Sequence, residues 1–268
     1  MFYYKKILNV ILNMNVLKNY VISLVTAEDR RLHISNEFSR KNIEFTFFDA
    51  INPKNMEFIA NKHSIQIKNS NLSDGEICCL LSHVCLWNLI IEKNLPYLAI
   101  FEDDIYLGEN AEIFLSDNSW IDPKWDILKI EKALGSTLMS LKLDNVEDNR
   151  KIGKLKAFYG GTGGYILSQN GAKSLLNYIK KLDVIDHIDQ IMFRHYLKEG
   201  SLSIYQMTPA ICIQDIVLNP KAINFPSSLT WIKKQKIKRS FIQKLFRELF
   251  RPIQQLIQLP FKREIKFK

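Results

Sequence analysis

Three consecutive carboxylates, Glu102, Asp103 and Asp104, form the group in this sequence whose type and spacing point most directly to chemistry. They follow residues 97–101, an apolar run of strand length, so a buried strand would deliver all three side chains to its carboxyl end. In open α/β sheets, ligands bind outside that end, and adjacent carboxylates repel one another unless a cation lies among them. Mg²⁺ or Mn²⁺, which take oxygen ligands and often share them with substrate phosphates, would suit such a site. The alternative is a solvated acidic turn.

The hydrophobic pattern predicts an α/β fold that would position these carboxylates. Residues 20–25 and 43–48 are β-rich apolar runs on either side of a helix-forming stretch at 27–41, and a strand, helix, strand unit of this length predicts a parallel sheet. A helix is predicted over residues 73–93, because this segment opens with a Ser-x-x-Glu capping box. Further strands are predicted at 125–130, 154–159, 202–206 and 210–213, and further helices at 170–181 and 188–198.

The positive charge of the chain is concentrated at one end. The 268 residues carry a formal charge of +9, but residues 232–268 alone hold 12 Lys and Arg against 2 Asp and Glu. The rest therefore has 25 basic and 26 acidic residues and is nearly neutral. A folded domain that binds nucleic acid through its surface would carry the basic excess itself, so the composition does not favour a nucleic-acid partner.

Cysteine usage indicates a reducing compartment. Cys78, Cys79, Cys85 and Cys212 include no CxxC pair and no second cluster that would complete a zinc site. Cys78 and Cys85 would share one face of the predicted helix, which suits core packing, and disulfide geometry within one helix forbids their pairing. Free thiols predict a cytoplasmic protein.

The basic segment has the pattern of an amphipathic helix. Its apolar residues recur at spacings of four, four, four, four and three, and Pro252 is expected to kink the helix or begin a second one. The basic face would attract anionic lipid headgroups, and the alternative is that the apolar stripe packs on the folded domain or on another subunit. We expect an extension at residues 1–18, a catalytic domain at 19–231 and a membrane-associating tail at 232–268. The apolar stripe consists of Ile237, Phe241, Leu245, Leu249, Ile253 and Leu256.

Several short segments, in order, resemble glycosyltransferase family 25, which includes bacterial lipopolysaccharide and lipooligosaccharide galactosyl- and glucosyltransferases. Together they cover nearly all of residues 19–215. The matching pieces are residues 20–24 with Arg30 and Arg31, 47–51, 72–77 with Ser82 and His83, 98–104, 161–168 with Ala172, and, more weakly, 186–190 and 209–214.

The resemblance implies a GT-A-like fold, a single Rossmann-type α/β domain with a mixed central sheet. It also implies an inverting transfer of a hexose from a UDP-sugar to a lipooligosaccharide acceptor, with galactose the first candidate and glucose the second. The acidic triplet corresponds to the DxD motif of the family, which assigns metal binding to Asp104 and, second, to Glu102, and donor contact to Asp103. The metal would be Mn²⁺ or Mg²⁺, bridging the donor diphosphate. The enzyme would act at the inner face of the bacterial cytoplasmic membrane.

Other candidates for donor binding follow the first two predicted strands. Arg30 or Arg31 could hold a nucleotide phosphate with two hydrogen bonds, although a helix surface is the ordinary place for arginine. Asp49, followed by Ala50, ends the second strand at the same sheet edge. The carboxylate could contact uridine or ribose, or could cap the next segment.

Glu76 and His83 form another candidate pair. They lie seven residues apart, hence on one face of the predicted helix, and they match a signature of the family. The resemblance implies donor or acceptor binding for them. A lone histidine on a helix face is more often simply hydrogen-bonded to a neighbour.

An inverting transfer needs a base, since the attacking hydroxyl must lose its proton as the new bond forms. Asp189 is the first candidate and Asp186 the second, because both lie in the segment that resembles a later acidic motif of the family. A spacing of three places them on one side of a helical turn. The alternative is that Asp186 caps a helix and Asp189 is a surface charge.

Two other function classes remain. A nucleotide-sugar or carbohydrate binding protein without turnover would result if the acidic triplet were structural. A nucleic-acid-binding protein is supported only by the basic segment after residue 232.

Overall fold

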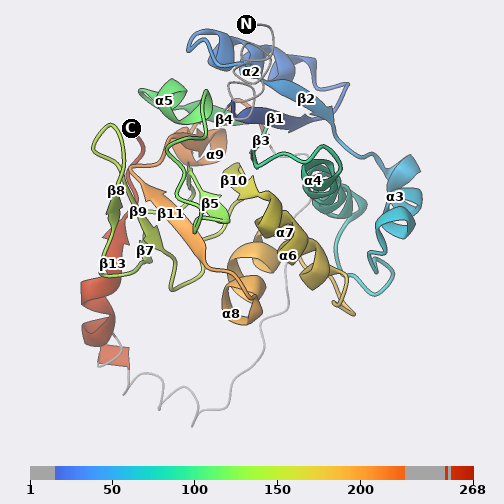
Figure 1. Ribbon diagram of the computed structural model, residues 1–268. Coiled ribbons are helices and arrows are strands. Elements are labelled where there is room, and N and C mark those ends of the chain that lie inside the picture. The colour runs from blue at the N-terminus through green and yellow to red at the C-terminus, as the bar shows by residue number, and fades with distance from the viewer. Residues whose placement is uncertain (1–15, 227–250, 253–254) are drawn as a thin grey trace, which may run out of the picture.

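A mixed sheet of eight strands forms the centre of the molecule (Figure 1). The computed structural model describes residues 16–226, 251–252 and 255–268. The prediction of an α/β domain with a mixed central sheet is confirmed, and the sheet is consistent with the GT-A-like fold. In order across the sheet, the strands are β2 (Thr46–Asp49), β1 (Lys18–Ser23), β3 (Tyr97–Glu102), β10 (Gly164–Ser168), β5 (Ile127–Lys129), β11 (Ile204–Thr208), β9 (Lys151–Lys154) and β8 (Asp144–Asn145).

Strand direction decides which residues meet at one edge. β1 pairs in parallel with β2 and β3, and β10 is antiparallel to both β3 and β5, so β5 runs in the same direction as β3. β11 is parallel to β5. The carboxyl ends of β1, β2, β3, β5 and β11 therefore lie at one edge of the sheet, together with the amino end of β10. This is the edge at which the acidic triplet is found.

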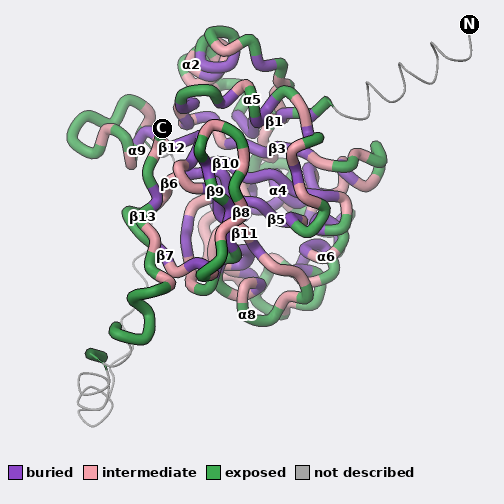
Figure 2. Tube along the Cα trace, turned by 60° about the vertical axis from the view of Figure 1, so that its left-hand side comes forward, coloured by how far each residue is buried: buried purple, intermediate pink, exposed green. Residues whose placement is uncertain are grey.

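Helices cover both faces of the sheet. α4 and α6 pack with the π-helical turn η2 on one face, and α2 and α5 pack on the other. Figure 2 shows buried segments along the sheet strands and exposed residues on the outer helices and turns. The helices are α2 (Glu28–Ser39), α3 (Met56–His63), α4 (Asp74–Glu92), α5 (Ala111–Leu115), α6 (Gln169–Ile179), α7 (Ile188–Gln190), α8 (Leu197–Glu199) and α9 (Asp215–Leu218), with 3₁₀ turns η1 (Pro53–Asn55) and η3 (Leu259–Phe261) and the π-helical η2 (Ile191–Tyr196).

The capping box predicted for the helix at 73–93 is present at the start of α4. The Ser73 hydroxyl accepts from the Glu76 amide, and the Glu76 carboxylate accepts from the Ser73 amide at 2.7 Å. By length and composition α4 could cross a membrane, but 61% of its apolar window is buried inside the fold. The apolar character of α4 is therefore that of a core helix.

One predicted strand lies earlier in the chain than expected. The prediction was residues 154–159, whereas β9 spans Lys151–Lys154. The chain leaves the sheet after Leu155 because Tyr159 turns inward: its hydroxyl accepts from the amides of Ala133 and Leu134 at 3.1 Å each. Tyr159 is fully buried, so an aromatic residue that looked like part of a strand holds a loop instead.

Two small sheets join distant parts of the chain to this domain, and one of them contains the last residues of the predicted tail. β13 pairs with β7, Ile265 is buried, and the Ala210 amide donates to the Lys266 carbonyl at 2.7 Å. Residues 262–268 thus pack on the domain. Residues 1–15, 227–250 and 253–254, which include most of the predicted amphipathic helix, lie outside the described residues. The additional strands are β4 (Ile105–Leu107), β12 (Cys212–Gln214) and β6 (Glu131–Lys132) in one sheet, and β13 (Lys262–Glu264) and β7 (Ser136–Leu138) in the other.

Arg150 binds residues 262–268, the returning segment, to the domain. Its guanidinium is completely buried and donates to four carbonyls, those of Glu109, Pro209, Ala210 and Lys268, at 2.7–3.2 Å. Five N–H groups in a rigid planar fork make arginine the residue suited to this role.

We expect Arg150→Ala to lower the free energy of unfolding by about 3 kcal/mol or more, because four carbonyls each lose a donor and Asp148, 3.2 Å away, loses one of its two cationic partners. Urea denaturation measures the change. Lys154→Ala, which removes an exposed cation from the neighbouring strand, is the control and should shift stability by less than about 0.5 kcal/mol. Equal stability of the two variants would contradict the role given to Arg150.

Candidate functional site

Glu102 and Asp104 are drawn together by one amide side chain. Glu102 ends β3, and Asp104 follows in the turn to β4. The Gln214 amide, at the end of β12, donates to Glu102 at 2.9 Å and to Asp104 at 3.2 Å. Thr162 donates to the other oxygen of Glu102 at 2.5 Å. Two carboxylates held within reach of a single NH₂ group form a compact oxygen-donor set.

The surroundings shift the pKa values of Asp104 and Glu102 in opposite directions. Burial and the neighbouring Glu102 raise the pKa of Asp104 to about 7. Burial also acts to raise the pKa of Glu102, but the nearby imidazole of His83 and the hydrogen bond from Thr162 outweigh it and leave this pKa below the ordinary value. A divalent cation between the two carboxylates would balance their charge, so the donor set fits Mn²⁺ or Mg²⁺.

Asp103, the middle residue of the triplet, has a different partner. It forms an ion pair with Arg30, and Arg30 also donates to the carbonyls of Phe225 and Pro226 at 3.0 Å each. Only 8% of Asp103 is exposed. Its charge is therefore already neutralised by the guanidinium, and Asp103 is not part of the oxygen-donor set of its neighbours.

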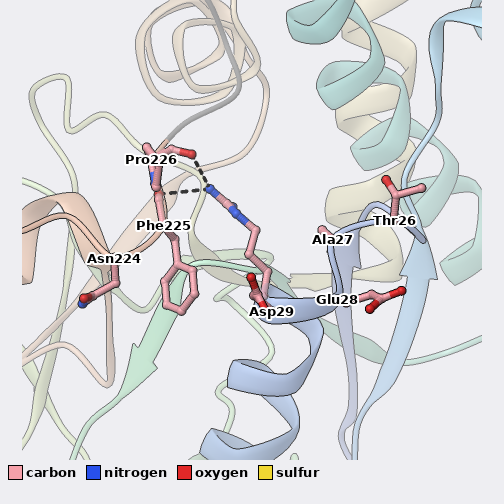
Figure 3. A pocket seen from close by; sticks show the side chains of 8 residues that line it. Thr26, Ala27, Glu28, Asp29, Asn224, Phe225 and Pro226 are labelled. Carbon is pink, nitrogen blue, oxygen red and sulfur yellow. Dashed lines mark hydrogen bonds between the residues drawn. The ribbon is translucent and has the colours of Figure 1, made fainter.

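A pocket of about 680 Å³ lies beside this ion pair. Its walls are residues 26–30, which form the end of the turn after β1 and the first residues of α2, and the loop at Asn224, Phe225 and Pro226 (Figure 3). Buried Asp215 shapes the loop, since its carboxylate accepts from the amides of Asn224 and Phe225 at 2.6 and 2.9 Å. The pocket is next to the carboxyl ends of the parallel strands, where ligands of α/β proteins bind.

Arg30 and Arg31, which the sequence could not distinguish as donor ligands, have different partners in the structure. Arg30 lines the pocket, whereas Arg31 pairs with Asp49 and donates to the carbonyls of Ser23 and Leu24 at 3.1 Å each. Arg31 thus joins the ends of β1 and β2. The Asp49 side chain stays 66% exposed, and the Ala50 amide donates to the Ser23 carbonyl at 2.9 Å. Asp49 and Ala50 therefore lie at the predicted edge, with the Asp49 carboxylate still open to solvent.

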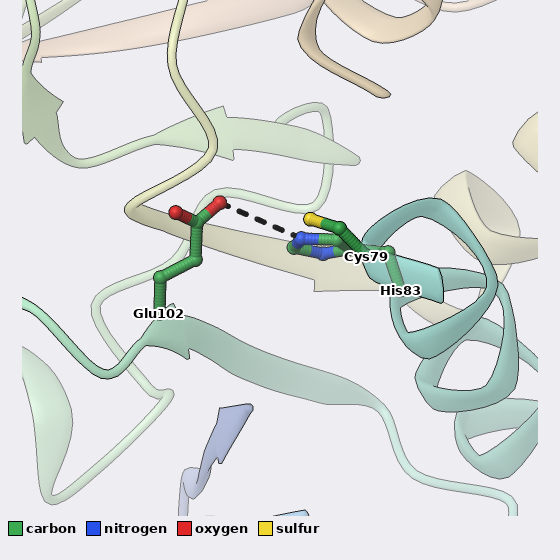
Figure 4. A group of neighbouring side chains, drawn as sticks. All are labelled: Cys79, His83 and Glu102. Carbon is green, nitrogen blue, oxygen red and sulfur yellow. Dashed lines mark ion pairs between the residues drawn. The ribbon is translucent and has the colours of Figure 1, made fainter. Parts of the chain in front are cut away.

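His83 is completely buried and is linked to Glu102. Its Nδ1 lies 2.8 Å from the Tyr165 hydroxyl, which also accepts from the indole of Trp87 at 2.9 Å. Its Nε2 lies 3.7 Å from Glu102 Oε1. The dashed line in Figure 4 marks this ion pair. Glu76, by contrast, uses its carboxylate in the capping box and lies 3.4 Å from His187 Nδ1. Of the two, His83 is the residue in contact with the acidic triplet.

The two candidate bases also differ. Asp189 accepts from the Gly161 amide at 3.3 Å, and a Cβ at Gly160 would come within 2.9 Å of the same carboxylate oxygen. Burial raises the pKa of the Cys79 thiol, and the negative charges of Glu102 and Asp189 raise it further. Asp186 instead accepts from the His187 amide at 2.9 Å, just before α7.

A buried ion pair that the sequence analysis did not predict lies beneath the glycine-rich loop, residues 160–164. Lys129 donates to Glu131 at 2.6 Å, both side chains are fully buried, and Glu131 accepts from the Gly163 amide at 3.0 Å. Gly161 has φ +83°, and a Cβ there would lie 2.7 Å from Glu131. The available signal was two opposite charges at a spacing of two, at the end of an apolar run of strand length.

The ion pair with Lys129 does not keep the pKa of Glu131 at its ordinary value. Burial raises the pKa of Glu131 and outweighs the opposing effect of Lys129.

Gln214 and Thr162 were likewise not singled out by the sequence, because nothing in a glutamine or a threonine alone marks it as a partner of distant carboxylates.

Known proteins are similar to this chain over most of its length. The family model described as glycosyltransferase family 25 (LPS biosynthesis protein) matches residues 16–192. A protein of Haemophilus influenzae Rd named as a glycosyltransferase is 42% identical over 205 residues, 75% of this chain and 72% of the relative. The lipooligosaccharide biosynthesis protein lic2B of H. influenzae is 38% identical, covering 79% and 81% of the two chains. The lacto-N-neotetraose biosynthesis glycosyltransferase LgtE of Neisseria gonorrhoeae is 33% identical over 75% of each.

These matches are to sugar-transferring enzymes. The chain is a member of glycosyltransferase family 25, and it acts in lipooligosaccharide or lipopolysaccharide biosynthesis.

Proposed function

We propose that this enzyme transfers a hexose, galactose before glucose, from a UDP-sugar to a lipooligosaccharide acceptor with inversion at the anomeric carbon. The observation that carries the proposal is the pairing of Glu102 and Asp104 through Gln214 beside the pocket at residues 26–30. An oxygen-donor set next to a pocket at the carboxyl ends of parallel strands suits a metal-bound diphosphate.

Glu102 and Asp104 would hold the Mn²⁺ or Mg²⁺ ion. When bound, such an ion neutralises the charge that develops on the diphosphate as the sugar departs. Arg30 lies in the pocket wall and is the guanidinium best placed for a donor phosphate, while Asp103 orients it through their ion pair. Asp49 and Ala50, at the end of β2, would contact the uridine or its ribose.

Asp189 is the proposed base. It takes the proton of the attacking acceptor hydroxyl as the oxygen bonds to the anomeric carbon and the bond from that carbon to UDP breaks, with the electron pair leaving on UDP. The amide of Gly161 donates to Asp189 and would hold the carboxylate toward the acceptor side. Asp186 is the weaker candidate because its carboxylate is already paired with His195 at 3.5 Å.

The assay that tests the activity is release of UDP from UDP-galactose and UDP-glucose, with lactosyl, glucosyl and heptosyl acceptors, in Mn²⁺ and in EDTA. We expect acceptor-stimulated release from one donor, abolished by EDTA. Asp104→Ala should lower kcat by about 10²-fold or more while leaving the circular dichroism spectrum unchanged.

UDP-sugars that raise the melting temperature in Mn²⁺ without any turnover would support the alternative, a nucleotide-sugar binding protein. The transferase proposal fails if UDP-sugars neither react nor raise the melting temperature.

The choice of base is tested by comparing two matched substitutions. Asp189→Asn should lower kcat by roughly 10²–10⁴-fold, because the amide cannot accept the proton, with little change in KM for the donor. Asp186→Asn is the control, and it should retain activity within a few fold. If the loss fell on Asp186→Asn instead, the assignment would be reversed.

We also propose that the enzyme associates with anionic lipid at the inner face of the cytoplasmic membrane through its basic segment. The support is the concentration of 12 basic residues in residues 232–268, beyond a nearly neutral domain. Because residues 262–268 are part of the fold, deleting the whole segment would remove β13. Charge substitution is therefore the cleaner test.

Replacing Lys236, Lys238, Arg239 and Lys244 with glutamine should weaken cosedimentation with phosphatidylglycerol vesicles by roughly 10²–10³-fold, at about 1 kcal/mol per charge, and should spare transfer to a soluble acceptor. The matched control replaces four exposed lysines of the domain and should bind like the wild type. Equal loss in both variants would mean that only net charge matters. The control positions are Lys54, Lys62, Lys151 and Lys154.

A further inference from the structure

A second set of metal-ligating side chains lies against the acidic triplet. Cys79 and His83 are four residues apart on α4, hence on the same face of this helix, and Glu102 ends the strand that faces them. The thiol sulfur, an imidazole nitrogen and a carboxylate oxygen all lie within 4.8 Å of one another. In Figure 4 the Cys79 and His83 side chains leave the helix side by side and point toward Glu102.

His83 presents an unused nitrogen to this group. Its Nε2 is buried and has no hydrogen-bond partner among the described residues, and the ring as a whole is 0% exposed. Its other nitrogen, Nδ1, is 2.8 Å from the Tyr165 hydroxyl. The Tyr165 oxygen accepts from Trp87 Nε1, and the metal-binding form of His83 is the tautomer in which Nδ1 also donates to this oxygen. In that tautomer the lone pair of Nε2 faces Cys79 and Glu102.

This is the second-shell arrangement of metal-bound histidines. The ring nitrogen that does not bind the metal donates to an oxygen, which sets the tautomer and the orientation of the ring. The chain from Trp87 through Tyr165 to His83 supplies that orientation from two different elements, α4 and β10. A buried imidazole that is held in this way, with its free nitrogen directed at a thiol and a carboxylate, is prepared to bind a cation.

We propose that Cys79, His83 and Glu102 bind a divalent transition metal of the zinc class. Thiolate and imidazole ligands select zinc-like ions over Mg²⁺ and Mn²⁺, and one thiolate with one carboxylate balances the charge of a divalent ion. Cys79 releases its proton to solvent as the metal–sulfur bond forms. Three protein ligands leave a fourth tetrahedral position for water.

The distances are compatible with such a site. With bonds of about 2.3 Å to sulfur and about 2.1 Å to nitrogen or oxygen, tetrahedral ligand atoms lie roughly 3.3–3.7 Å apart. Nε2 of His83 and Oε1 of Glu102 are already 3.7 Å apart. The remaining separations, up to 4.8 Å, require the ligand atoms to close by about 1 Å on binding.

Sharing of Glu102 gives the site a consequence for the enzyme, and this part rests on the proposed function. A zinc ion that holds Glu102 removes this carboxylate from the pair it forms with Asp104. Binding of zinc should therefore oppose binding of Mn²⁺ or Mg²⁺ and inhibit sugar transfer.

Cobalt(II) is the probe for the site, because a thiolate ligand gives Co²⁺ a charge-transfer band in the near ultraviolet and tetrahedral geometry intensifies its visible bands. Titration of the purified full-length protein should reach one equivalent, and Zn²⁺ should displace the signal. Cys79→Ser should abolish the charge-transfer band. Tyr165→Phe, which removes the oxygen that orients His83, should weaken cobalt binding by about 10–100-fold.

Cys85→Ser is the matched control. Cys85 lies on the same helix and also has a histidine neighbour, with its sulfur 3.7 Å from His63 Nε2. This variant should keep the full band. Absence of the band in the wild type, its persistence in Cys79→Ser, or its loss in Cys85→Ser would each overturn the proposal.

Inhibition is measured separately, as the ratio of transfer rates with and without Zn²⁺ at fixed Mn²⁺ for each variant. Cys79→Ser should raise the zinc concentration for half-inhibition by at least 10-fold, and Cys85→Ser should not change it. Since the cobalt titration needs no turnover, failure of the transferase proposal would leave the metal site testable, and failure of the metal site would leave the transferase proposal intact.

Discussion

The acidic triplet brings three like charges to the end of β3, a strand whose central residues are buried. Repulsion between charges is poorly screened there because little water is present. The surrounding structure separates these charges by giving each its own partner. Arg30 pairs with Asp103, Gln214 bridges Glu102 and Asp104, and Thr162 and His83 approach Glu102. What is left unbalanced is the pair at Glu102 and Asp104, and that is where a cation is expected. The position of the pocket, the loops and the candidate base all follow from this edge.

The glycine-rich loop shows how the fold brings acidic groups close to the triplet without adding to its charge. Glu131, at the start of β6, is buried beneath the loop, but Lys129 at the end of β5 neutralises it, and the Gly163 amide donates to it. The loop can lie this close only because residue 161 is a glycine and has no Cβ. A Cβ at this position would collide with Glu131. On its outer side the loop amide of Gly161 meets Asp189. One short loop therefore connects a buried ion pair with the candidate base.

The returning segment at residues 262–268 gives the basic region a defined relation to the domain. One end leaves the pocket at Pro226, where Arg30 holds the carbonyl, and the other end is fixed by β13 and by Arg150. A basic segment attached on both sides differs from a free tail, since its ends are held to the same rigid body. If it binds lipid, the pocket and the membrane surface keep a limited distance.

Much of the fold could be predicted from local sequence. The helix at 73–93 and the strand at 97–101 appear as α4 and β3, because a capping box and an apolar run are local signals that tertiary packing did not override. The segment at 154–159 was misjudged because the destination of the Tyr159 side chain, a loop 25 residues away, leaves no trace in the local pattern. The same reasoning applies to β13, whose partner β7 is distant in the chain.

The sequence by itself determined the acidic triplet, its place at the end of a buried strand, and the family, because these depend on neighbouring residues and their order. Tertiary structure alone decided which arginine meets the triplet, which aspartate meets the glycine loop, and that Gln214, 110 residues from Asp104, bridges the carboxylates. It also decided that Cys79, His83 and Glu102 face one another. The physical reason is strand direction: parallel β1, β3 and β5 bring remote residues to one edge, and pairing between strands is a long-range property that no local window contains.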